Sequence, residues 1–205
     1  MRLVIFGATG RTGSEIVHRA LQDGHEVKAL VRTPEKCVPH QRLTLIQGDV
    51  REAEAVKQMI AGADAVVSAL GTDRTTTLTE AMPAIMEGME IHRVSRILTI
   101  GTAGILQSRI DLSKLRYEAG DSNRKLTFAA EEHHKVFKML RSSSLDWTIV
   151  CPTYLPDGEA VGTYRIERDV LPLDGKQIST GDTAAFAYQE LIEKKHIGYR
   201  IGISY

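Results

Sequence analysis

The stretch that decides the fold begins with Leu3-Val-Ile-Phe6 and continues as Gly7-Ala-Thr-Gly10-Arg-Thr-Gly13. The four apolar residues predict a buried strand, and the periodic apolar positions that follow predict a helix from about Thr12 to Asp23. A strand, a glycine-rich turn and a helix in this order are typical of a dinucleotide-binding loop. Gly7 allows the tight turn, Gly10 lets the main chain approach a pyrophosphate, and Gly13 permits close packing of the helix on the strand.

The start of this helix is a predicted anion site. Free N–H groups and the positive end of the helix dipole would bind the diphosphate of a nicotinamide dinucleotide, and the hydroxyls of Thr9 and Thr12 would add donors. The alternative is a sharp turn that binds nothing. Glycines cost conformational entropy wherever the backbone does not need them, so three at this spacing favour the binding loop.

The rest of the chain alternates short apolar runs with segments of helical period. We expect strands at 27–31, 43–46, 65–70, 96–100, 147–151 and 199–204, a hairpin strand at 163–170, and helices at 51–61, 78–92, 126–142 and 181–194. This alternation predicts a doubly wound α/β fold, in which right-handed crossovers join parallel strands and helices cover both faces of the sheet. With 205 residues, we expect one dinucleotide-binding Rossmann domain over 1–205, with 153–180 covering the substrate. The irregular segments 103–125 and 153–180 both follow strand ends, where such sheets bind ligands.

Composition excludes several classes of function. The 26 basic and 26 acidic side chains cancel, so no global field attracts nucleic acid or an anionic membrane. No apolar run approaches the roughly 18 residues that cross a bilayer. Cys37 and Cys151 are too few and too far apart for a disulfide framework or a metal cluster, and the adjacent His133 and His134 cannot share a helix face. We therefore expect a cytoplasmic monomer without a metal site.

The end of the second predicted strand indicates which dinucleotide binds. Proteins that prefer NAD usually carry Asp or Glu there to hold the ribose hydroxyls, but this chain reads Val31-Arg32-Thr33. The planar guanidinium of Arg32 suits the 2′-phosphate of NADP, with Arg11 and Lys36 as further cations. A solvated arginine at a strand end is the alternative. The missing acid favours NADPH over NADH.

The G-x-x-G-x-x-G spacing and the Leu30-Val-Arg32 stretch resemble the atypical short-chain dehydrogenases/reductases over nearly the whole chain. Within that superfamily the chain is most similar to NmrA-like proteins, the flavin reductase/biliverdin-IXβ reductase group and bacterial NADH-flavin reductases. The resemblance implies that Asp49 and Val50 contact the adenine. It also implies that Ala69, Leu70 and Gly71 line the ribose and pyrophosphate.

The resemblance also identifies candidate catalytic residues. Short-chain dehydrogenases carry a Tyr-x-x-x-Lys pair on the helix after the fifth strand, and this pair is absent here: if His133 takes the lysine position, Ala129 takes that of the tyrosine. Thr102 takes the place of the family's Ser or Thr and would orient the nicotinamide or the substrate. Tyr154 stands where related reductases have a histidine, and Pro152 and Thr153 would close over the carboxamide. Structural roles are the alternatives: a strand end for Thr102, a solvated helix face for His133 and loop packing for Tyr154.

The missing Tyr–Lys pair separates the possible activities. A planar conjugated acceptor such as a flavin stabilises the added charge itself. Hydride transfer to it therefore depends less on a proton-transferring Tyr–Lys pair than the oxidation or reduction of an alcohol does. The sequence therefore predicts an NADPH-dependent reductase of a flavin-like acceptor. A dinucleotide sensor of the NmrA type, which binds without catalysis, is the second hypothesis. A sugar-nucleotide epimerase is the third hypothesis and the least favoured, because its chemistry requires the tyrosine that is missing here.

Overall fold

The computed structural model describes residues 1–72, 74–121 and 126–205. Its centre is an eight-stranded sheet in the order β3-β2-β1-β4-β5-β6-β8-β7. The strands are β1 (Arg2–Phe6), β2 (Glu26–Val31), β3 (Leu43–Gln47), β4 (Ala65–Ser68), β5 (Arg96–Ile100), β6 (Asp146–Pro152), β7 (Arg165–Arg168) and β8 (Tyr199–Ser204). Neighbouring strands are parallel except β7, which pairs antiparallel with β8. The doubly wound Rossmann sheet predicted from the sequence is confirmed.

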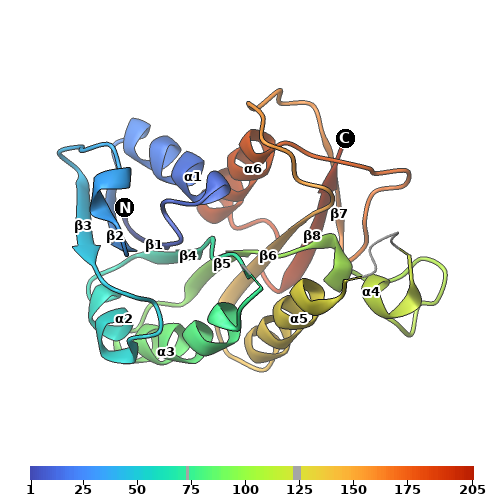
Figure 1. Cartoon of the computed structure of the whole chain (residues 1–205), viewed down its shortest axis with the longest axis horizontal. Helices are drawn as coiled ribbons and strands as arrows, with labels where there is room; N and C mark the ends of the chain where they lie inside the picture. Colours follow the sequence, from blue (N-terminus) through green and yellow to red (C-terminus); the bar gives the residue numbers. More distant parts are fainter. Residues whose placement is uncertain (73, 122–125) are drawn as a thin grey trace.

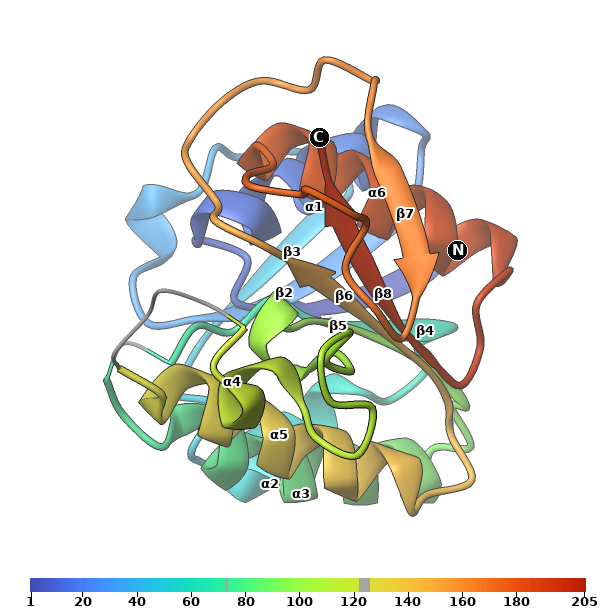
Figure 2. The same cartoon turned by 90° about the vertical axis from the view of Figure 1, so that its right-hand side faces the viewer.

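Helices cover both faces of this sheet (Figure 1). The longer ones are α1 (Arg11–Gln22), α2 (Ala53–Met59), α3 (Thr77–Ile91), α5 (Phe128–Arg141) and α6 (Thr180–Glu193), and α4 (Arg116–Ala119) is a single short turn. Helices α1 and α6 lie side by side on one face, whereas α2, α3 and α5 cover the other. Figure 2 shows the same layers from the side, with α1 and α6 above the sheet and α2, α3 and α5 below it.

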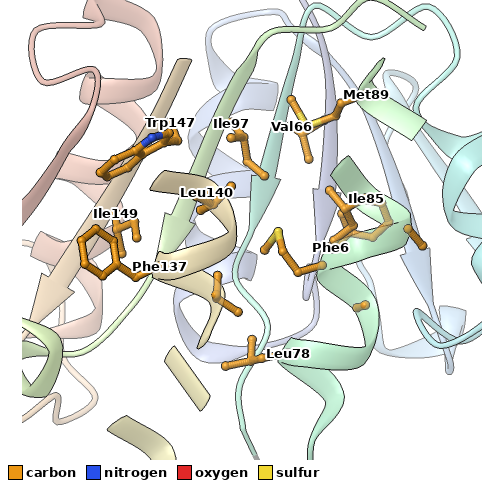
Figure 3. Packing of buried hydrophobic residues seen from close by; sticks show 14 of the residues in the cluster. Phe6, Val66, Leu78, Ile85, Met89, Ile97, Phe137, Leu140, Trp147 and Ile149 are labelled. Atoms are coloured by element: carbon orange, nitrogen blue, oxygen red, sulfur yellow. The ribbon is translucent and has the colours of Figure 1, made fainter. Parts of the chain in front are cut away.

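Two apolar clusters hold the layers together, one on each face of the sheet. In the cluster of Figure 3, Phe6, Val66 and Ile97 come from adjacent strands and face the helices. Ile85 of α3 and Leu140 of α5 pack against them, and all five side chains are fully buried. Burial on both faces explains why the central strands read as continuous apolar runs.

The structure differs from the sequence-based expectations mainly at element ends. The fourth strand ends at Ser68 rather than residue 70, because the chain leaves the sheet there to border a cleft. Helix α4 and the 3-10 turns Pro34–Lys36 and Ala103–Ile105 were not predicted. Each is held by local contacts without apolar periodicity, such as the bond of 2.9 Å from the Leu115 amide to Glu118. Part of the predicted irregular segment 103–125, at 122–125, lies outside the described residues.

Candidate functional site

The glycine-rich loop connects β1 to α1 in a tight turn. Gly7 has a φ of +81°, and the Gly10 amide donates to its carbonyl at 3.0 Å. A Cβ on Gly13 would lie 2.1 Å from the Gly7 oxygen, so the third glycine is required for helix α1 to approach β1. Gly10 differs, since its backbone is extended and a Cβ there would meet the nearest atom at 3.2 Å. The first and third glycines build the turn, and the middle one keeps its outer side open.

The N-terminus of α1 is free to bind an anion. Gly10, the N-cap residue, has no side chain that could cap the helix, and no side chain of the described residues accepts a hydrogen bond from the first amides of α1. The first N–H groups of a helix have no partner within the helix, so an acceptor from outside can take them. Thr12 in this first turn is buried and Thr9 is exposed. The loop therefore has the cradle and the donors that a pyrophosphate requires.

A first hollow, of about 200 Å³, opens on one side of this loop, at the carboxyl ends of β1, β2, β3 and β4. It is lined by Gly7, Thr9, Gly10, Leu30, Val31, Arg32, Gly48, Asp49, Val50, Arg51, Ala69, Leu70, Gly71, Thr75 and Thr77. The structure thus brings the predicted Arg32, Asp49 and Val50 together with the glycine loop. Asp49 accepts a bond of 3.0 Å from the Arg51 amide, and Val50 packs against the core.

Sequence reasoning missed several residues of this hollow. The guanidinium of Arg51 donates to Thr77 Oγ1 at 2.8 Å and pairs with Glu80 at 2.9 Å. These partners belong to α3, and only the packing of α2 against α3 brings them near the end of β3. Leu30 forms part of the floor, where a Cβ on Gly48 would approach its Cδ1 to 2.9 Å. The glycine after the third strand was the available signal for that close contact.

A second hollow, of about 780 Å³, shares Gly10 and Ala69–Gly71 with the first, so the two form one cleft across the strand ends. It is lined by Gly10, Arg11, Thr12, Ala69, Leu70, Gly71, Thr72, Ile100, Gly101, Thr102, Ala129, His133, Pro152, Thr153, Tyr154, Leu155, Pro156 and Asp157. The candidate catalytic residues Thr102, His133 and Tyr154 all meet here. Pro152 and Thr153 line the same hollow.

Thr102 and Tyr154 are held by the backbone around them. Thr102 Oγ1 accepts from the Gly104 amide at 3.5 Å, so it caps the 3-10 turn that follows β5. The Tyr154 carbonyl accepts from the Ile178 amide at 3.0 Å, while 57% of the residue's surface stays exposed. Tyr154 therefore presents its ring on a fixed main chain.

His133 lies one helical turn after Ala129 in α5, and both residues line the second hollow. Desolvation lowers the pKa of His133 to about 4, and the charge of Glu132 opposes this only in part. The imidazole is consequently neutral near pH 7. It cannot replace the permanent positive charge that a lysine would supply.

This shift links His133 to stability. An unfolded histidine has a pKa near 6.5, so between pH 6.5 and 4 the unfolded chain binds more protons and stability falls as the pH is lowered. We expect His133→Gln to remove about 1 to 2 kcal/mol of the stability difference between pH 7 and pH 5. Urea unfolding at both pH values measures it, with His18→Gln, on the exposed side of α1, as the control. Equal pH dependence in both variants would contradict the assignment.

The structure places Arg11 and Lys36, the two further cations expected from the sequence, away from Arg32. The first turn of α1 points Arg11 toward the segment after β6, where it donates to the Leu155 carbonyl at 3.1 Å and to Asp157 at 2.9 Å. The 3-10 turn Pro34–Lys36 places Lys36 in a separate hollow beside Cys37. Neither cation lines the first hollow with Arg32.

Three other candidate features are a reactive cysteine, a metal site and a membrane-spanning helix. Cys151 is fully buried in β6, and burial raises the pKa of its thiol, so it belongs to the core. Among the described residues, no three His, Cys, Asp or Glu side chains are grouped so that they could hold a metal ion. Over the same residues, no helix has the length and apolar character needed to cross a membrane.

Comparisons with known proteins agree with this geometry. The NAD(P)H-binding family matches residues 7–194. Protein YwnB of Bacillus subtilis, named as uncharacterized, is 29% identical over 213 residues, which cover 99% of this chain and 98% of that protein.

Two solved structures superpose on the whole chain with a TM-score of 0.85. One, from Streptococcus pneumoniae, is provisionally named an NADH-flavin reductase; it is 27% identical, and 99% of it is covered. The other, from Bacteroides thetaiotaomicron, is provisionally named an epimerase; it is 28% identical, and 96% of it is covered. With the family match, the Rossmann sheet and the glycine-rich loop, this chain belongs to the NAD(P)H-binding family of oxidoreductases, within the atypical short-chain dehydrogenases/reductases.

Proposed function

We propose that this protein transfers a hydride from NADPH to a planar conjugated acceptor such as a flavin. The observation that carries the proposal is the composition of the second hollow around α5. Ala129 and a neutral His133 line it beside Thr102, in place of the Tyr–Lys pair that transfers a proton in alcohol chemistry. An acceptor that stabilises its own added charge needs no such pair, since a solvent proton can follow.

The cleft fits a nicotinamide dinucleotide. Gly7 and Gly13 form the turn, Gly10 leaves its outer side open, and α1 presents an uncapped N-terminus to the diphosphate. The first hollow would hold the adenosine, with Asp49 and Val50 at the adenine and Arg32 at the 2′-phosphate. Ala69, Leu70 and Gly71 would line the ribose and pyrophosphate between the hollows.

The second hollow would hold the reacting partners. The bound nicotinamide supplies the hydride, and the residues of the chain orient it and exclude water. Thr102 would orient the nicotinamide, Pro152 and Thr153 would border its carboxamide, and Tyr154 would flank the acceptor ring. Because such a transfer depends mainly on stacking the two rings, proximity accounts for most of the rate.

The proposal includes the organisation and setting of the protein. Residues 1–205 form one Rossmann domain, in which part of 153–180 covers the acceptor. The protein acts as a monomer in the cytoplasm, and the free thiols of Cys37 and Cys151 support the reducing compartment.

Arg32 sets the preference for NADPH in this proposal. We expect Arg32→Ala to weaken NADPH binding roughly 10- to 100-fold, because charge-assisted bonds to a phosphate are lost, and to change NADH binding little. Isothermal titration with both dinucleotides measures the two dissociation constants. Arg32→Lys, which keeps the charge without the planar fork, should fall between. Equal losses for both dinucleotides would refute the assignment to the 2′-phosphate.

One assay separates reductase from sensor. NADPH is mixed with the purified protein and FMN or riboflavin, and the nicotinamide absorbance is followed. Turnover supports the reductase. Tight NADPH binding without oxidation by any flavin or quinone supports a non-catalytic sensor, which the absence of the Tyr–Lys pair also favours.

A further inference from the structure

A segment we call the strap, residues 153–162, forms one wall of the second hollow and is bound along one margin to the start of α6. The Gly181 amide donates to the Gly158 carbonyl at 2.9 Å, and the buried Asp182 accepts from the Gly162 amide at 2.8 Å. A Cβ on Gly181 would lie 2.4 Å from the Ala160 nitrogen, so the backbone of the strap and the first turn of α6 are in close contact. This margin is fixed.

The other margin of the strap faces the phosphate loop, and there the attachment is slight. Among the described residues, the only hydrogen bonds from the strap to this loop are those of Arg11 to the Leu155 carbonyl and to Asp157. Arg11 and Asp157 are 59% and 75% exposed. Exposed pairs of this kind contribute little to stability, so this attachment can open without unfolding its surroundings.

The contact bridges the second hollow. Gly10–Thr12 and Leu155–Asp157 line the same hollow from different elements, the start of α1 and the strap after β6. A molecule seated beneath the bridge leaves more slowly while the two sides are joined. The bridge also fixes the distance between the phosphate loop and Tyr154, which precedes Leu155 in the strap.

We propose that Arg11 and Asp157 form a clasp that holds the strap over the bound dinucleotide and slows its release. Both are positioning residues. The clasp rests on the proposed function in placing the nicotinamide half in the second hollow. It assigns to Arg11 a partner across the cleft instead of the 2′-phosphate.

The test measures NADPH release by stopped-flow displacement. Asp157→Asn should raise the dissociation rate roughly two- to fivefold at low salt, whereas Glu159→Gln should not change it. Glu159 is the matched control, since it lies in the same strap and its carboxylate pairs with no described residue. At 1 M NaCl, where such pairs are screened, the rates of wild type and Asp157→Asn should converge.

A double-mutant cycle separates the clasp from direct contact with the diphosphate. Arg11→Gln should raise the release rate as Asp157→Asn does, and the double variant should release NADPH no faster than either single variant. Arg11→Lys, which keeps the positive charge, should release NADPH almost as slowly as wild type. Fully additive effects would mean that the two side chains act separately and would overturn the proposal. Release rates equal to that of Glu159→Gln would overturn it too.

Hydrogen exchange without dinucleotide distinguishes the two possible failures. The amides of Ile178 and Thr180, which donate to the strap carbonyls of Tyr154 and Pro156, should exchange faster in Asp157→Asn than in Glu159→Gln, whether or not a cofactor binds. If wild type binds no nicotinamide dinucleotide, the proposed function fails while this measurement still tests the contact. If NADPH binds and neither release nor exchange responds to Asp157→Asn, the clasp alone is wrong.

Discussion

Gly10→Ala is expected to abolish dinucleotide binding while the protein stays folded. Gly10 has φ −77° and ψ 164°, a conformation open to any residue, and its Cβ would lie 3.2 Å from the Gly7 oxygen and 3.9 Å from the Ala69 oxygen. The added methyl would stand where the diphosphate must approach the first amides of α1. Losing two charge-assisted hydrogen bonds corresponds to a roughly 100-fold or greater rise in dissociation constant.

Titration calorimetry with NADPH and NADH measures this loss, and circular dichroism with thermal unfolding verifies the fold. Both dinucleotides should be affected alike, since both carry the diphosphate. This pattern separates Gly10 from Arg32, where only NADPH should respond. Binding within a few-fold of wild type would show that the diphosphate does not lie against Gly10.

Gly13→Ala is expected to destabilise the protein itself. The new Cβ would lie 2.1 Å from the Gly7 oxygen and 2.9 Å from its carbonyl carbon, both backbone atoms that cannot turn aside. Helix α1 would have to move away from β1, at a cost of about 3 kcal/mol or more. Helix propensity acts in the opposite direction, because alanine favours a helix interior over glycine by about 1 kcal/mol.

Urea unfolding in the absence of dinucleotide measures this effect, because bound ligand would add stability of its own. Gly10→Ala serves as the comparison in the same loop and should lose far less. Unchanged or increased stability of Gly13→Ala would mean that the close contact between α1 and β1 is not required.

The sequence predicts the sheet, the glycine-rich loop and the strand ends of the cleft because each follows from local pattern. Apolar runs identify strands that are buried on both faces, and a glycine in a positive-φ turn needs no distant partner to explain it. The position of Arg32 could be predicted for the same reason: it follows the strand that pairs with β1, and the ends of the two parallel strands lie side by side. Parallel strands then bring all these ends to one edge.

Side-chain direction and distant pairing could not be predicted in this way. Arg11 lies next to Gly10 in the chain, yet its guanidinium contacts Asp157, far along the sequence. Arg51, which precedes α2, is oriented by Glu80 of α3, and the 3-10 turn Pro34–Lys36 directs Lys36 away from Arg32. Such contacts depend on how helices and loops pack after the sheet has formed.

The pairing of α1 with α6 has a consequence for biosynthesis. The two helices share one apolar cluster, and the Tyr188 hydroxyl of α6 donates to Asp23 at 2.6 Å, just after α1. On the ribosome, α1 is made early and α6 more than 150 residues later. A nascent chain therefore carries its phosphate loop on a helix that can pack on β1 and β2 but lacks its neighbour α6, and this layer of the fold is complete only after translation has passed α6.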